Sequence, residues 1–119
     1  MSTNCRIGVY HDDDNTTSSI SCHFDGHPDG VGAALIAEHN ADAPARALVA
    51  SGNVSAIVGG VDRGAHTEGP ARHDCDDWPD SGQDWFYLWT GTVWLAAARV
   101  DDGAGGFWLD WTTVDEARA

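Results

Sequence analysis

Histidine and aspartate alternate over a short stretch that joins a predicted strand to a predicted helix. This stretch runs from His23 through Asp25 and His27 to Asp29. A carboxylate two residues from an imidazole can orient that ring for proton transfer or for metal binding. The simpler interpretation is that Asp25 caps a turn and that His23 is an ordinary residue of the sheet surface. We expect His23, Asp25 and His27 to contribute to a ligand-binding site.

The spacing of this stretch excludes two familiar loops. In a calcium-binding loop that starts at Asp25, His27 would stand at position 3 of the loop and Ile36 at position 12, where a glutamate is required. In a dinucleotide-binding loop, Leu35 would replace the third glycine, and Asp25 and Asp29 would repel a pyrophosphate. The sequence also has no GxxxxGK[ST] loop and no GxSxG motif, so no complete catalytic motif is present.

A second group of chemically active side chains lies in the long segment 59–84. Its histidines and cysteine match no standard zinc spacing, so a metal ion there would need further ligands from the strand-to-helix turn. Without them the segment is a solvated acidic loop. We therefore predict no cofactor and keep a divalent metal ion as an alternative. The candidate ligands of such an ion are His23, Asp25, His66, His73 and Cys75.

An arginine in the same segment could contact an anion. Arg63 lies between Asp62 and Gly64, and a guanidinium beside a flexible glycine can bind a phosphate or a carboxylate. The alternative is that Arg63 neutralises nearby aspartates in a very acidic chain. We include Asp62 and Arg63 in the predicted ligand-binding site.

Aromatic side chains alternate along residues 85–89. Trp85 and Tyr87 share one face of this predicted strand. On a sheet with one open face they could form an exposed platform that stacks a nucleobase or binds a partner. The alternative is that a small domain uses them to fill its core. We include Trp85 and Tyr87 in the predicted site.

The elements that must position these residues follow from hydrophobic periodicity. Two strands, 5–10 and 19–24, predict a hairpin, and two helices, about 30–40 and from Asp42 to Gly52, predict a helical hairpin. Residues 54–58 are either a short strand or a buried connector. The last predicted strands are 85–90, 92–100 and 107–114. This pattern predicts an α+β domain, in the order β-β-α-α-β-β-β, whose mainly antiparallel sheet of about five strands carries the helical hairpin on one face.

Length and charge limit the class of protein. The 119 residues predict a single domain, 1–119, with a long irregular loop at 59–84. The chain has 6 arginines, no lysine and 19 acidic residues, for a net charge of −13. Scattered cations argue against direct nucleic-acid binding and against membrane attachment. Three cysteines without a CxxC motif indicate a reducing compartment. A GC-rich genome, a high-salt cytoplasm or imitation of DNA could each explain the acidity.

Several stretches of the chain together resemble a family of small uncharacterised tailed-phage proteins. The matching stretches are RIGV at 6–9, SISCHFDGHPDGVG at 19–32, LVASGNVSAI at 48–57, Asp62-Arg63-Gly64, and Trp85–Leu88 ahead of Trp94. They are similar to a core "S-x-Y-x-H-W-D-G-Y-P" and a downstream "D-R-G-E" of that family. The chain departs from it at Phe24, His27 and Ala65, where the family has Trp, Tyr and Glu. The resemblance covers about residues 5–95.

The resemblance implies a virus-encoded accessory protein in the cytoplasm of the infected host cell, without a known activity. We expect non-catalytic binding of a host protein or of a small nucleotide-like ligand, in host takeover or anti-defence. One alternative is a small metal-dependent hydrolase or nuclease that uses His23, Asp25, Asp62 and His66. Another is an acidic decoy that imitates DNA. An exposed tryptophan face would favour a homodimer.

Overall fold

The structure is a computed structural model that describes residues 3–62, 64, 68–74, 77–79 and 83–118. Within these ranges the chain is an α+β fold built on one six-stranded sheet. Its strands are β1 (Cys5–His11), β2 (Thr16–Cys22), β3 (Ala71–Asp74), β4 (Trp85–Trp89), β5 (Trp94–Asp101) and β6 (Phe107–Thr113). The helical segments are the π-helical turn η1 (Pro28–Gly32), α1 (Ala33–Glu38), α2 (Asp42–Ala50) and α3 (Val114–Arg118).

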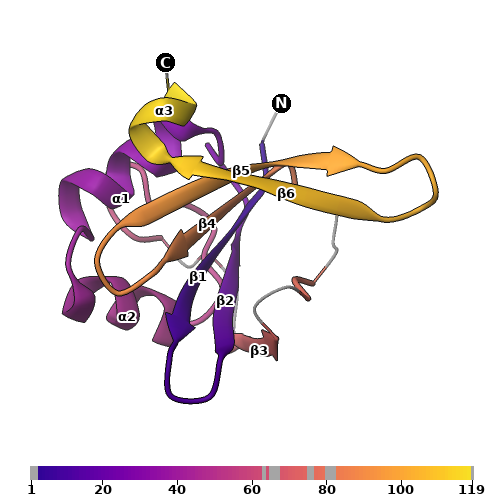
Figure 1. Ribbon diagram of the computed structural model, residues 1–119. Helices are drawn as coiled ribbons and strands as arrows, with labels where there is room; N and C mark the ends of the chain where they lie inside the picture. The colour runs from indigo at the N-terminus through magenta and orange to yellow at the C-terminus, as the bar shows by residue number, and fades with distance from the viewer. Residues whose placement is uncertain (1–2, 63, 65–67, 75–76, 80–82, 119) are drawn as a thin grey trace.

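The strands are ordered β3-β2-β1-β4-β5-β6. β1 pairs with β4 in parallel, and every other neighbouring pair is antiparallel. A parallel neighbour requires a crossover connection, and here the crossover includes η1, α1, α2 and the edge strand β3 (Figure 1). The first five residues of β1 are all buried. A strand that is buried on both sides indicates that both faces of the sheet are covered.

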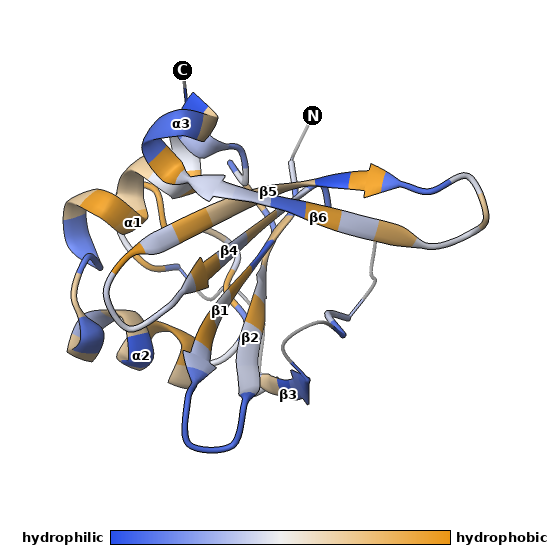
Figure 2. Ribbon diagram, viewed as in Figure 1, coloured by the Kyte–Doolittle hydropathy of each residue, from blue (hydrophilic) through white to orange (hydrophobic). Residues whose placement is uncertain are grey.

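Helices cover one face of the sheet, which we call the helix face and define by Ile7, Ile20 and Tyr87. α1 and α2 both lie on this side of the sheet (Figure 1). The amphipathic helix α2 contributes Leu48 and Val49 to the core beneath it. Figure 2 shows that apolar residues recur along β1 and β4, whereas the turn between β1 and β2 is hydrophilic.

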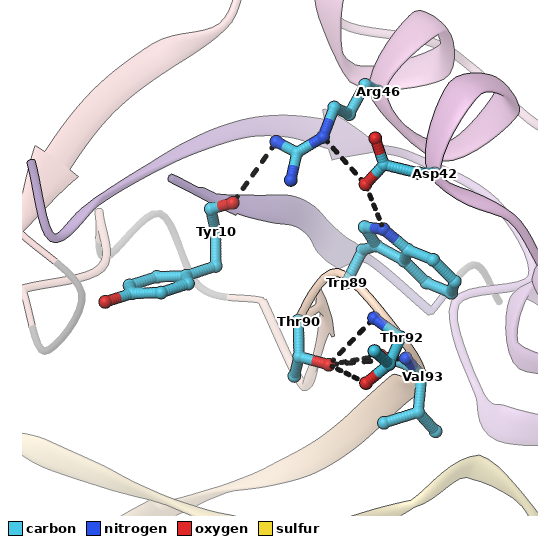
Figure 3. Close-up of polar contacts among 7 residues, drawn as sticks. All are labelled: Tyr10, Asp42, Arg46, Trp89, Thr90, Thr92 and Val93. Atoms are coloured by element: carbon cyan, nitrogen blue, oxygen red, sulfur yellow. Dashed lines mark hydrogen bonds and ion pairs between the residues drawn. The ribbon is translucent and has the colours of Figure 1, made fainter. Parts of the chain in front are cut away.

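A polar contact fixes α2 against the ends of β1 and β4 (Figure 3). The carboxylate of Asp42, at the start of the helix, accepts hydrogen bonds from Trp89 Nε1 at 3.1 Å and from Arg46 Nε at 2.9 Å. Arg46 Nη1 also donates to the backbone oxygen of Tyr10 at 3.2 Å. The bond from Trp89, followed by that from Arg46, lowers the pKa of Asp42 below its usual value.

A loop residue covers the opposite face, which we call the second face and define by Arg6 and Phe86. Trp78 is 5% exposed, and its ring centroid lies 5.6 Å from that of Phe86 and 5.7 Å from that of Trp111. Beneath the indole is Gly8, where an added Cβ would lie 2.6 Å from Trp78 Cη2. The second face therefore has a small core of its own. The absence of a side chain at Gly8 of β1 leaves the space that the Trp78 ring occupies.

The α+β class is confirmed, and the sheet is mainly antiparallel as predicted, but among the described residues it has six strands instead of about five. The described residues form six strands with one parallel pair, and the segment 59–84 contains β3 instead of being irregular throughout. β3 has the polar sequence ARHD, so periodicity could not predict it. Residues 54–58 make only isolated bridges, Val54 with Cys22 and Ala56 with Asp62. β2 begins at Thr16, earlier than predicted, and the added stretch contains the polar residue Thr17, which is fully buried.

The helical part also differs from the predicted two-helix hairpin. The helix predicted at about 30–40 begins at Pro28 as a π-helical turn and continues as α1 to Glu38. The helix predicted from Asp42 is confirmed as α2. α3 was not predicted, and it packs against η1. No helix among the described residues is long and apolar enough to span a membrane.

Candidate functional site

The start of β1 and the end of β2 form one side of a polar cleft. Arg6 and Ser21 are register partners in this antiparallel pair, so their side chains are neighbours on the second face. Asn53 lies beside them, because the Ser21 amide donates to Asn53 Oδ1 at 2.9 Å. The cleft has a volume of about 270 Å³ and is lined by Asn4, Cys5, Arg6, Ser21, Cys22, His23, Asn53 and Gln83.

Arg6 is the unusual residue of this cleft, because it is charged and only 7% exposed. Its Nε donates to Ser19 Oγ at 2.7 Å and its Nη2 to the Ser19 carbonyl at 3.3 Å. In the described part of the chain no carboxylate contacts the guanidinium. Burial lowers the pKa of Arg6. The usual pKa of an arginine is so high, however, that the guanidinium stays charged at neutral pH. Buried arginines normally have an anionic partner.

A chain of hydrogen bonds on the second face holds Arg6 in place. Ser19 Oγ lies 2.8 Å from His73 Nε2, and His73 Nδ1 lies 2.8 Å from the Asp74 carbonyl. A carbonyl can only accept, so His73 Nδ1 carries the proton and Ser19 donates to Nε2. The geometry is that of a serine activated by a histidine, but Ser19 is fully buried. This chain therefore positions Arg6 and does not present a nucleophile.

Acid is expected to weaken the fold through His73. Burial is the largest cause that lowers the pKa of His73, and the nearby Arg6 adds to it. Between the lowered pKa and the ordinary value near 6.5 the unfolded chain binds more protons than the folded chain. The stabilising contribution of neutral His73 is therefore complete above about pH 6.5 and is lost as the pH falls below it.

Urea unfolding of the protein and of His73→Gln, compared at several pH values between about 5 and 8, measures this effect. The comparison with His73→Gln is needed because acid also relieves repulsion among the many carboxylates. We expect the protein to lose stability relative to His73→Gln as the pH falls. Parallel pH profiles for the two proteins would contradict the assignment.

Of the predicted turn residues, His23 lies at the cleft and the others do not line it. His23 is exposed, as its alternation with the buried Cys22 predicts. Asp25 and His27 are exposed in the turn before η1, where the Asp25 carbonyl accepts from the Val31 amide at 2.8 Å. The strand predicted at 19–24 ends at Cys22, and Phe24 beyond it is 44% exposed.

The other polar predictions lie away from the cleft or outside the described residues. Asp62 is exposed, and its Oδ1 accepts from the Gly64 amide at 2.9 Å, as in a local turn. His73 belongs to the buried chain described above. Within the described ranges no three His, Cys, Asp or Glu side chains gather closely enough to hold a metal ion. Three of the predicted residues lie outside the described ranges, namely Arg63, His66 and Cys75.

The predicted aromatic platform is wrong, because Trp85 and Tyr87 face the helices. Trp85 is partly buried against the helix-face core, and Tyr87 is fully buried in it. The Tyr87 hydroxyl donates to the Gly26 carbonyl at 2.7 Å, and burial raises the pKa of this phenol far above its usual value. Through this hydrogen bond Tyr87 supports the turn at 25–30.

Replacing Tyr87 with phenylalanine is expected to lower the free energy of unfolding by about 1–3 kcal/mol, because the buried Gly26 carbonyl loses its donor. Urea denaturation measures the change. The half-buried Tyr10, whose hydroxyl makes an exposed hydrogen bond to Asn15 Oδ1, provides a matched control, and Tyr10→Phe should have a much smaller effect. Equal losses in the two variants would contradict the role of the Tyr87 hydroxyl.

Sequence reasoning missed the cleft because most of its residues are neutral and carry no motif. Asn4, Ser21, Asn53 and Gln83 are separated in sequence and meet only in the fold. One signal was available in the first strand, where a lone arginine stands in the apolar stretch CRIGVY. A charge at that position of a central strand is typical of a functional residue.

Comparison with known proteins does not place this chain in a family. A scan against models of known protein families found no match, and searches of curated proteins and of solved structures found none either. The functional inference therefore depends on the cleft, and above all on the surroundings of Arg6.

Proposed function

We propose that the protein is a non-catalytic binding protein that holds a small anionic ligand on Arg6. The observation that carries this proposal is an arginine residue that is only 7% exposed, whose guanidinium is held by Ser19 and has no carboxylate partner among the described residues. Removing such a charge from water is costly unless an anion compensates it. A phosphate or carboxylate in the cleft would supply that charge and accept the Nη donors that Ser19 leaves.

The rest of the lining favours a ligand that also carries hydrogen-bond donors. Asn4 Oδ1 is buried and has no hydrogen-bond partner in the part of the chain that the structure describes, and it would accept from an N–H or O–H group. Ser21, Asn53 and the buried Gln83 add neutral polar groups. The volume of about 270 Å³ is at the small end for ligand pockets. These properties support a nucleotide-like ligand of about the size of a mononucleotide.

His23 lies at the exposed side of the same cleft and could act as a second donor to the anion. Amide, hydroxyl and guanidinium groups bind and orient a ligand, and this composition supports binding in preference to catalysis. Together with the resemblance of residues 5–95 to tailed-phage proteins, the proposal is a virus-encoded protein that sequesters a small nucleotide-like ligand in the infected cell.

A thermal-shift screen tests this function and identifies the chemical class of the ligand. The compounds are inorganic phosphate, citrate, nucleoside 5′-monophosphates and the matching uncharged nucleosides. We expect the monophosphates to raise Tm most, phosphate less, and nucleosides not at all, because a ligand stabilises the state that binds it. Shifts equal for nucleosides and monophosphates, or no shift with any anion, would overturn the proposal.

A further inference from the structure

A pair of cysteines lies at the same end of the sheet, on the helix face. Cys5 is the first residue of β1, Cys22 is the last residue of β2, and the two are register partners in this antiparallel pair. Directly opposed residues of antiparallel strands have Cα atoms about 4.5–5.5 Å apart, which is within the range of disulfide geometry. In the structure both residues are free thiols.

We propose that Cys5 and Cys22 form a reversible redox pair that small-molecule disulfides oxidise to an intramolecular disulfide. Their position supports this proposal, because both residues line the cleft and both stand at strand ends. The thiols are 0% and 1% exposed, so the reaction requires local opening. Strand ends open more readily than the middle of a sheet.

The surroundings of the two thiols assign their roles. Cys22 is the last residue of β2 and is followed directly by the exposed His23 and Phe24, whereas Cys5 is paired with Cys22 on one side and with Trp85 of β4 on the other. Interaction with Cys5 is the largest cause that lowers the pKa of Cys22, and burial raises the pKa of Cys5. Since the thiolate is the reacting form of a cysteine, Cys22 is the attacking residue and Cys5 the resolving residue.

The chemistry is thiol–disulfide exchange in two steps. The Cys22 thiolate attacks one sulfur of the small disulfide, whose S–S bond breaks, and one small thiolate leaves with a mixed disulfide left on Cys22. Cys5 then gives its proton to the departed thiolate, attacks the Cys22 sulfur and expels the second small thiolate, which takes up from solvent the proton that Cys22 lost on forming its thiolate. Overall, two protein thiols are oxidised to one disulfide, and one small disulfide is reduced to two thiols.

The experiment incubates the full chain carrying Cys75→Ser with mixtures of oxidised and reduced glutathione. Alkylation of the remaining thiols and intact mass spectrometry then follow. We expect a monomeric product lighter by two hydrogen atoms, a Cys5–Cys22 cross-link in the peptide map, and full reversal by excess reduced glutathione. Closing this loop should raise Tm by about 10 °C.

Single variants separate the roles of the two thiols. Cys5→Ser should accumulate the glutathione mixed disulfide on Cys22, and Cys22→Ser should stay unmodified. If a serine variant does not fold, as judged by circular dichroism, the alanine variant replaces it. Cross-linking only in denaturant, covalent dimers as the main product, or a lower Tm after oxidation would overturn the proposal.

Discussion

Replacing Trp78 with alanine is expected to lower the free energy of unfolding by about 3–5 kcal/mol, as for other buried aromatic residues. Trp78 comes from the loop between β3 and β4, yet it is 5% exposed and forms the centre of the second-face core. Its ring contacts Phe86 and Trp111 and lies 5.0 Å from the ring of His73. Alanine would leave a cavity above Gly8 that the rigid sheet cannot close.

Trp108 provides the matched control for this prediction. It lies on the edge strand β6 and is 52% exposed, so Trp108→Ala should change stability by about 0.5 kcal/mol or less. Urea unfolding of the two variants compares a loop tryptophan with a strand tryptophan. A loss for Trp78→Ala as small as that for Trp108→Ala would show that the loop does not cover the second face.

Replacing Arg6 with glutamine is expected to weaken binding of the anionic ligand by about a hundredfold or more, the usual effect of removing one partner of a buried charge pair. The free protein should behave differently. Without ligand the guanidinium has no counter-charge among the described residues, so its removal should leave the free energy of unfolding unchanged or higher. A variant that loses binding but keeps its stability is typical of a residue that serves function and lowers the stability of the fold.

Arg72→Gln is the matched control for Arg6→Gln. Arg72 lies on the edge strand β3, is exposed, and pairs with the carboxylate of Asp14. Its replacement removes a cation from the same sheet without changing the cleft, so ligand affinity should remain within about twofold of the unmodified protein, as for exposed ion pairs. If Arg72→Gln weakened binding as much as Arg6→Gln, the effect would come from net charge instead of the cleft.

Local periodicity predicts the parts of this fold whose burial repeats along the chain. The apolar stripe of Leu48 and Val49 predicts α2, and alternating apolar residues predict β1, β5 and β6. β3 has four residues of polar sequence, so only its pairing with β2 makes it a strand. The parallel pairing of β1 with β4 is likewise a long-range contact that no local pattern contains.

The site shows the same limit. The alternation of His23 with Cys22 predicts a side chain on the outer face of the sheet, and the structure places His23 in the lining of the cleft. Alternation alone could not decide which face of β4 meets the helices, so the prediction of a platform at Trp85 and Tyr87 is wrong. The burial of Arg6 and its lack of a carboxylate partner among the described residues depend on residues that are far away in sequence. They can therefore be recognised only in the folded structure.

Isothermal titration calorimetry with a nucleoside 5′-monophosphate tests the central claim most directly. The measurement compares the unmodified protein with Arg6→Gln and Arg72→Gln. We predict binding at one site in the unmodified protein and in Arg72→Gln, and no measurable heat in Arg6→Gln, whose circular dichroism spectrum should show an intact fold. Equal affinity in a folded Arg6→Gln variant, or the absence of binding to every anion in the screen, would contradict the assignment of the cleft as an anion site.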